Sequence, residues 1–347
     1  MSAELPIPPF YDQANARRFA YRPDAGELFR AAAAWRAERG LRPRGEDSRR
    51  TNLLLVDVQR DFCFPEGSLF VGGRSGTGAM DDNDRLARFV YRNLHLISEI
   101  TCTLDTHFPH QIFFPSFWVD RAGAPLEAHR EIAREEVAAG DVRPNPDLAH
   151  WLAGGDQGWL ARQAEFYCAE LERAGKYRLY LWPPHCLLGG DGHVLAGVVQ
   201  EARLFHAFAR SARDGTEIKG GHPLSENYSV FAPEVLLTHD GGSLGAPNRE
   251  LALSLLSADA LVVAGQAASH CVKSSLEGLL EVILEEDPAL AKKVYVLRDC
   301  MSAVAVPDPT RPGQLAADFT PQAEAALGRL ADAGMHVVDS TRPISDW

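Results

Sequence analysis

Cys271 lies where an apolar segment gives way to a helical pattern. Residues 260–264 have the character of a buried parallel strand, and residues 273–280 follow with helical spacing. Cys271 is therefore expected near the first turn of a helix, where unpaired backbone N–H groups and the positive end of the helix dipole favour a thiolate. A thiolate there can attack an acyl carbon, and neighbouring N–H groups can hold the resulting oxyanion. The alternative is a small cysteine that only packs at the end of a strand.

Two further ionisable residues end strand-like segments. Asp57 follows the apolar run of residues 52–56, and a carboxylate in that position faces the crevice where open α/β sheets bind ligands. Lys219 follows Ile218 and precedes a glycine turn. Taken singly, the aspartate could close a turn and the lysine could be a solvated surface residue. Together with a thiol they meet the needs of amide hydrolysis, because a carboxylate can carry the thiol proton to the leaving amine and an ammonium favours both anions.

The three segments together resemble the nicotinamidase/isochorismatase-like cysteine hydrolase superfamily. Asp57 stands in Asp-x-Gln-x-Asp-Phe, Lys219 precedes a glycine, and Cys271 stands in Gly-x-Ala-x-x-x-Cys-Val. The family uses Asp, Lys and Cys, in this chain order, as a catalytic triad, so the resemblance implies that role for these three residues. It covers residues 51–118 and 182–305.

The resemblance also implies an unusual backbone before the nucleophile. In the family, the peptide bond between the second and third residues of the cysteine motif is cis, and its N–H helps to form the oxyanion hole. In this chain that bond joins Gln266 to Ala267. A cis bond before a residue other than proline is costly enough to be kept only for function. Gln266, Ala267 and Cys271 are therefore expected to form the oxyanion hole.

A carboxylate and two imidazoles suggest a metal site. Asp105 and His107 stand two residues apart after a strand-like segment, and His185 stands in Trp-Pro-Pro-His-Cys. This set suits one divalent transition ion, with zinc as the first expectation and iron or manganese as alternatives. Any single histidine says little, since the chain contains 12. However, Asp-x-His and Trp-Pro-x-His-Cys are the metal motifs of nicotinamidases, so the resemblance implies Asp105, His107 and His185 as ligands and favours the nicotinamidase branch.

Two aromatic residues match positions that hold the substrate ring in nicotinamidases. These are Phe62 and Trp182, and stacking on a flat heteroaromatic ring can add roughly 0.5–1.5 kcal/mol beyond the burial of area. The alternative is that both are ordinary core aromatics. The resemblance implies that the metal binds the pyridine nitrogen and directs the carboxamide toward Cys271. It thus implies hydrolysis of nicotinamide, or a related heteroaromatic amide, to the acid and ammonia through a thioester, as in NAD salvage.

Strand-like and helical segments alternate from residue 52 to residue 338 without a linker break. This alternation predicts one α/β domain with a parallel sheet and helices on both faces. The expected architecture is a three-layer sandwich with a mostly parallel sheet of about six strands. The chain of 347 residues is longer than a typical family member, so we expect additions to this domain.

The additions fall in two places. Residues 1–50 form an N-terminal extension, and residues 51–347 form the hydrolase domain, which carries a helical insertion at 119–181. Because both ends of the insertion adjoin metal motifs, it is expected to narrow substrate access and to pack at the interface of a homo-oligomer. Helices are expected at residues 24–39, 125–134 and 160–171.

Composition limits the partners and the compartment. The net charge of −12 disfavours nucleic acid as a partner. The sequence has no apolar run that could span a membrane and no signal-peptide core. The six cysteines lack regular spacing, which favours a reducing compartment over a disulfide framework. The expected protein is a cytoplasmic enzyme that binds a small-molecule amide.

Three other functions fit parts of the pattern. Gln266, Ser269 and His270 are unusual beside the nucleophile, so the pocket could suit another small amide or a carbamoyl compound. Two histidines and one carboxylate also describe a non-haem iron oxygenase, although that function leaves the triad without a role. A non-catalytic binding member of the superfamily is the third alternative, and the retention of all triad and metal residues speaks against it.

Overall fold

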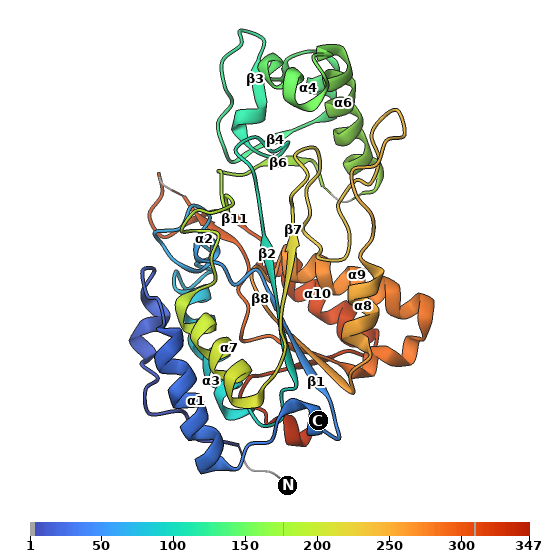
Figure 1. The fold of residues 1–347 in the computed structure, drawn as a ribbon. Coiled ribbons are helices and arrows are strands. Elements are labelled where there is room, and N and C mark those ends of the chain that lie inside the picture. The colour runs from blue at the N-terminus through green and yellow to red at the C-terminus, as the bar shows by residue number, and fades with distance from the viewer. Residues whose placement is uncertain (1–3, 176, 309) are drawn as a thin grey trace.

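The computed structural model describes residues 4–175, 177–308 and 310–347, and its centre is a six-stranded sheet (Figure 1). The strand order is β12-β9-β8-β1-β2-β7, and every neighbouring pair is parallel. The strands are β1 (Thr51–Val56), β2 (Glu99–Asp105), β7 (Asp214–Lys219), β8 (Ala260–Gly265), β9 (Val294–Leu297) and β12 (His336–Val338).

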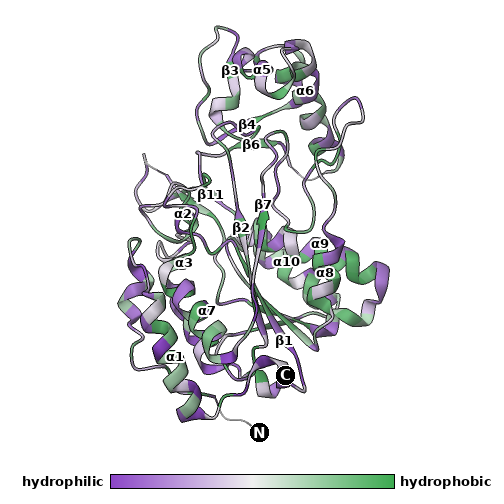
Figure 2. Cartoon of the chain, in the orientation of Figure 1, coloured by the Kyte–Doolittle hydropathy of each residue, from purple (hydrophilic) through white to green (hydrophobic). Residues whose placement is uncertain are grey.

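Helices cover both faces of this sheet (Figure 1). Leu53 and Leu55 of β1 pack in the core shared with one set of helices, whereas Leu54 and Val56 pack in the core of the other set, as the alternation of side chains along a strand requires. Figure 2 shows that these helices carry both hydrophobic and hydrophilic residues. The first set is α1 (Ala25–Arg39), α3 (Gly78–Arg92) and α7 (Gly197–Arg210), and the second is α8 (Arg249–Leu256), α9 (Cys271–Glu286) and α10 (Thr320–Asp332). The predicted three-layer α/β sandwich is confirmed.

The N-terminal segment packs against the sandwich. The expected helix at residues 24–39 is α1, and the Asp24 side chain caps it by accepting a hydrogen bond from the Glu27 N–H. Leu28 and Trp35 of this helix are buried in the same core as α7. The segment therefore covers apolar surface of the sandwich.

The insertion, drawn at the top of Figure 1, supplies much of a separate hydrophobic core. This core also contains residues that flank the insertion and Leu224, Val235 and Leu244. The expected helix at residues 160–171 lies within α6 and is confirmed. The expected helix at residues 125–134 is wrong, because residues 130–132 form a strand that pairs antiparallel with residues 179–181 and buries Ile132. The elements here are β3 (Trp118–Asp120), β4 (Arg130–Ile132), α4 (Arg134–Ala138), β5 (Val142–Pro144), α5 (Ala149–Leu152), α6 (Gln157–Arg173) and β6 (Leu179–Leu181).

Three short elements border the carboxyl edge of the sheet. They are α2 (Arg60–Cys63), which follows β1, and the antiparallel pair β10 (Ala305–Pro307) and β11 (Leu315–Asp318). In the described part of the chain, no helix combines the length and apolar character that a membrane span requires.

Candidate active site

Four adjacent strands bring the predicted catalytic residues to one edge of the sheet. In the register of β2 with β7, Asp105 lies opposite Lys219. Asp57 follows β1, which lies between β2 and β8, and Cys271 begins α9 shortly after β8 ends. Because the strands are parallel, their carboxyl ends meet, and the residues that follow them converge on one place.

The connection from β8 to α9 passes very close to β1. Gly265 has a φ of +128°, and a Cβ atom on it would lie 2.0 Å from the carbonyl oxygen of Val56, so only glycine fits there. The next peptide bond, Gln266–Ala267, is cis, as the motif predicted. The Gln266 side chain is fixed on both sides, since it donates to Asp82 at 2.9 Å and accepts from the Ser302 N–H at 3.2 Å.

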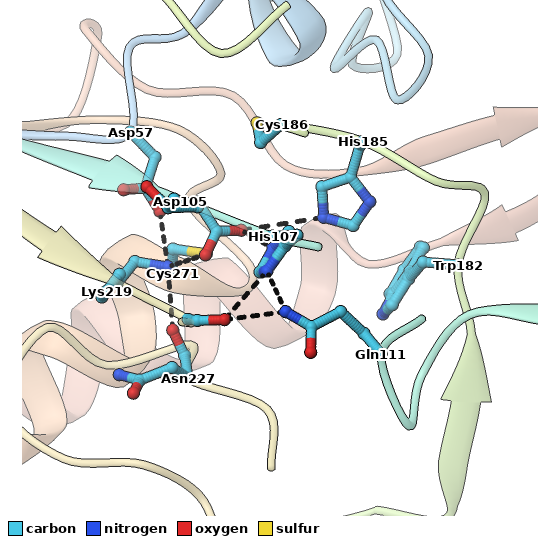
Figure 3. A network of polar contacts seen from close by, with 12 residues as sticks. Asp57, Asp105, His107, Gln111, Trp182, His185, Cys186, Lys219, Asn227 and Cys271 are labelled. Carbon is cyan, nitrogen blue, oxygen red and sulfur yellow. Dashed lines mark hydrogen bonds and ion pairs between the residues drawn. The ribbon is translucent and has the colours of Figure 1, made fainter. Parts of the chain in front are cut away.

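Lys219 is the centre of the predicted triad (Figure 3). Its Nζ lies 2.9 Å from Asp57 Oδ2 and 3.6 Å from Cys271 Sγ. The same Nζ lies 3.0 Å from Asp105 Oδ1 and donates to the Asn227 carbonyl oxygen at 2.8 Å. All three triad side chains are buried. One ammonium group therefore links the thiol, its neighbouring carboxylate and the predicted metal ligand Asp105.

The electrostatics of the triad favour a protonated thiol at rest. Burial raises the pKa of the Cys271 thiol well above its usual value, although Lys219 acts in the opposite direction. Burial also raises the pKa of Asp57, again against the effect of Lys219. Burial acts to lower the pKa of Lys219, but Asp105 and Asp57 outweigh it and hold that pKa well above its usual value. Burial thus outweighs the effect of the helix start, which would lower the pKa of the thiol, and Cys271 is protonated in the absence of a substrate.

Asp105, His107 and His185 form a compact group of candidate metal ligands. All three are buried, and one ligand atom from each lies within 4.8 Å of the others. His107 Nε2 is 2.8 Å and His185 Nε2 is 3.7 Å from Asp105 Oδ2. Burial acts to raise the pKa of Asp105, but His107 and Lys219 outweigh it and hold that pKa well below the usual value. The carboxylate is therefore ionised and ready to bind a cation.

The second nitrogen of each histidine faces a backbone carbonyl. Nδ1 of His107 lies 3.2 Å from the Gly220 oxygen, and Nδ1 of His185 lies 2.8 Å from the Pro183 oxygen. A carbonyl can only accept a hydrogen bond, so the His185 contact places its ring proton on Nδ1 and leaves Nε2 as the ligand atom. Nδ1 of His107 also lies 3.2 Å from the side-chain amide nitrogen of Gln111, and its Nε2 lies 2.8 Å from the Asp105 carboxylate, so His107 has an acceptor beside each ring nitrogen. The donor set and its orientation fit a divalent transition ion.

Gly220 makes room for this group, and its substitution gives a direct test. A Cβ atom there would lie 2.6 Å from His107 Cε1 and 2.8 Å from Asp105 Oδ1, and the φ of Gly220 is +82°. Gly220→Ala should therefore displace His107 and lower the bound metal per chain, measured by elemental analysis. Gly221→Ala is the matched control, because a Cβ at Gly221 has no neighbour within 4 Å. Equal metal content in both variants would contradict this role of Gly220.

Phe62 and Trp182 line the same cavity as Cys271 and the candidate metal ligands. Phe62 lies on α2 with its ring centroid 5.5 Å from that of His185. The Trp182 indole N–H donates to the Tyr228 hydroxyl at 2.7 Å, which fixes the indole at the cavity wall. Every residue that the sequence predicted for the site thus lies at or beside this cavity.

Several residues that surround the site were not identified from the sequence. Gln59, within the Asp57 motif, clamps Asp105 through two hydrogen bonds of 2.8 Å, one to its carbonyl oxygen and one from its N–H. Phe113 and Tyr228 line the cavity, and both lie in the stretches that the resemblance covers. Glu226 also lines it, and no motif marked it.

The fold has relatives among solved structures. The chain is similar to the yeast nicotinamidase bound to the inhibitor nicotinaldehyde, with a TM-score of 0.50 and 17% sequence identity over 83% of this chain and 99% of that chain. Another structure of the yeast nicotinamidase gives a TM-score of 0.49, with 17% identity over 83% and 99% of the two chains. The Acinetobacter baumanii nicotinamidase/pyrazinamidase gives 0.47, with 17% identity over 85% and 99%.

At this identity, the likeness to the first of these structures shows a shared fold, and it agrees with the fold expected from the motifs. No protein-family model matches the chain, and no curated protein matches its sequence.

Proposed function

We propose that this chain is a metal-dependent cysteine amidase that hydrolyses nicotinamide, or a closely related heteroaromatic amide, to the acid and ammonia. The proposal is carried by one observation: Asp57 Oδ2 and Cys271 Sγ both lie within 3.6 Å of Lys219 Nζ. Beside them lies the compact group of candidate metal ligands. The fold shared with a nicotinamidase supports it.

In the first half-reaction, Asp57 accepts the proton of the Cys271 thiol, and Sγ attacks the carboxamide carbon. The C–S bond forms as the carbonyl oxygen becomes an oxyanion, which the N–H groups of Ala267 and Cys271 would hold. Asp57 then returns the proton to the amide nitrogen, the C–N bond breaks and ammonia leaves. The ammonium of Lys219 favours both the thiolate and the Asp57 carboxylate throughout.

In the second half-reaction, water attacks the thioester. Asp57 accepts a proton from the water, the C–S bond breaks and the acid is released. The proton returns to Sγ, and the enzyme is restored. The same carboxylate serves as base and acid in each half, so its raised pKa, caused by burial, suits the work.

The ring of the substrate has its own supports. Phe62 and Trp182 would flank it as apolar walls, and Asp105, His107 and His185 would hold the metal ion. When bound, that ion would supply a positive centre for the ring nitrogen. A carboxamide on such a ring would then point toward Cys271, because the metal ligands and the thiol line one cavity.

A second cavity favours a larger amide as an alternative substrate. It has a volume of about 250 Å³ and shares Trp182, Tyr228 and His270 with the first cavity as walls. Tyr177 and Tyr180 of the insertion also line it. A bulkier acyl group that displaces these shared side chains could extend into it.

A panel of amides tests the proposed function. Purified protein loaded with zinc should release ammonia from nicotinamide and pyrazinamide, and more slowly, by at least about tenfold, from benzamide, which lacks the ring nitrogen. Acetamide and a simple carbamoyl compound serve as aliphatic controls, and quinoline-3-carboxamide tests the second cavity. Failure to release ammonia from any heteroaromatic amide would contradict the proposal.

The organisation of the chain follows from the same proposal. We propose residues 1–50 as an extension of the hydrolase domain at 51–347, with the insertion at 119–181 and assembly as a cytoplasmic homo-oligomer. The separate core of the insertion and the packing of α1 on α7 support the first two parts. Light scattering of the purified protein measures the third.

A further inference from the structure

Glu226 is a buried carboxyl group in the wall of the catalytic cavity. The Tyr167 hydroxyl donates to Glu226 Oε2 and accepts from the Glu226 backbone N–H, both at 2.9 Å. The Tyr177 hydroxyl donates to the same Oε2 at 3.3 Å. Both tyrosines belong to the insertion, and Tyr167, on α6, is fully buried. The insertion thus forms hydrogen bonds with both the side chain and the backbone of Glu226.

The two residues after Glu226 reach the catalytic groups. The carbonyl oxygen of Asn227 accepts a hydrogen bond from Lys219 Nζ at 2.8 Å (Figure 3). The hydroxyl of Tyr228 accepts one from the Trp182 indole at 2.7 Å. A shift of residues 226–228 would therefore move a ligand of the triad lysine and a support of the ring-binding tryptophan together.

From these contacts we propose that Tyr167 and Glu226 are positioning residues, through which the insertion holds Lys219 and Trp182 in their places around Cys271. The importance of this for turnover rests on the proposed amidase function, but the coupling itself does not. No described residue within 119–181 lines the catalytic cavity, so the insertion acts on that cavity through the wall residues that it contacts. The rings of Tyr180 and Tyr177 pack against Trp182 and Tyr228, and the Tyr167–Glu226 contact adds hydrogen bonds to this packing. The insertion then fixes the wall of the cavity that residues 226–228 form, and we call the Tyr167–Glu226 contact the brace.

The charge of Glu226 gives the brace a measurable signature. Burial, assisted by Glu234, raises the pKa of Glu226 to about 8, while the hydroxyls of Tyr167, Tyr228 and Tyr177 act in the opposite direction. The group is therefore mainly neutral at pH 7 and gains a charge above pH 8. Since its folded pKa lies above its ordinary value, the stability linked to it is present at low pH and is lost as the pH rises through about 8.

Tyr167→Phe and Glu226→Gln test the proposal. The first removes the hydroxyl that makes two of the contacts, and the second keeps the shape of a neutral carboxyl group but cannot ionise. Tyr91→Phe is a matched control, because the buried Tyr91 on α3 likewise donates to a buried carboxylate, Glu201 Oε1, at 2.8 Å. Two readouts are compared: kcat and KM for the amide, and the rate at which iodoacetamide alkylates Cys271, which needs no turnover.

Tyr167→Phe should lower kcat/KM about tenfold, the equivalent of one positioning hydrogen bond, and change the alkylation rate several-fold. Tyr91→Phe should leave both within about twofold, as expected of a distant site. The pH profiles of alkylation and of unfolding midpoint should show an inflection near pH 8 in the unsubstituted protein, which Glu226→Gln removes.

A Tyr167→Phe protein that matches Tyr91→Phe in both readouts would overturn the proposal. If Tyr167→Phe does not fold, an inflection that persists in Glu226→Gln would overturn it instead. If the protein hydrolyses no amide but shows the expected changes in alkylation rate, the proposed amidase function is wrong and the positioning role of Tyr167 and Glu226 still holds.

Discussion

Replacing Cys271 by alanine should abolish amide hydrolysis, with kcat lowered by roughly 10⁴-fold or more, since the nucleophile itself is removed. Its Sγ lies 3.6 Å from Lys219 Nζ at the start of α9, and no other thiol lines the cavity among the described residues. Cys271→Ser should also lose most activity, because a hydroxyl is much harder to deprotonate than a thiol. Initial rates of ammonia release measure both variants.

Cys102→Ala is the matched control for this experiment. Cys102 is also fully buried, within β2, and burial raises its pKa to about 12. It should cost some stability and little activity. Iodoacetamide should label Cys271 before Cys102, since Cys271 borders the cavity and Cys102 does not. Near-normal turnover by Cys271→Ala would show that the proposed mechanism is wrong.

Replacing His107 by alanine should remove the metal ion and most of the activity. Purified protein is expected to hold about one divalent transition ion per chain, and the variant little or none. The loss in kcat/KM should reach at least roughly 100-fold, because the substrate loses the partner of its ring nitrogen. Chelation of the unsubstituted protein should have the same effect, and added zinc should reverse it.

Folding should survive the loss of the metal. The sandwich has extensive cores on both faces of the sheet, so its stability does not depend on an ion. His206→Ala serves as control, because His206 is equally buried but contacts the Ile97 carbonyl oxygen, away from the cavity. It should retain the metal. A metal-free protein with full activity would remove Asp105, His107 and His185 from the site.

The sequence by itself determined the strands of the central sheet that carry the site and the residues that follow them. The apolar run that became β8 and the helical pattern of residues 24–39 that became α1 are local signals, since a strand or a helix depends on a few consecutive residues. The cis bond at Gln266–Ala267 and the grouping of Asp105, His107 and His185 were implied by the resemblance of short motifs to a known family, and the structure contains both.

The tertiary structure alone decided how these pieces meet. The pairing of Asp105 with Lys219 depends on β2 lying beside β7, a neighbour more than a hundred residues away. The failed helix at residues 125–134 has the same origin, because β6 supplies the hydrogen bonds that make residues 130–132 a strand. The hydrogen bond from Tyr167 to Glu226 joins the insertion to the segment that follows β7. The pattern of one segment cannot predict such contacts. Their free energy depends on two segments that are distant in the sequence, and neither segment alone indicates which other segment it will contact.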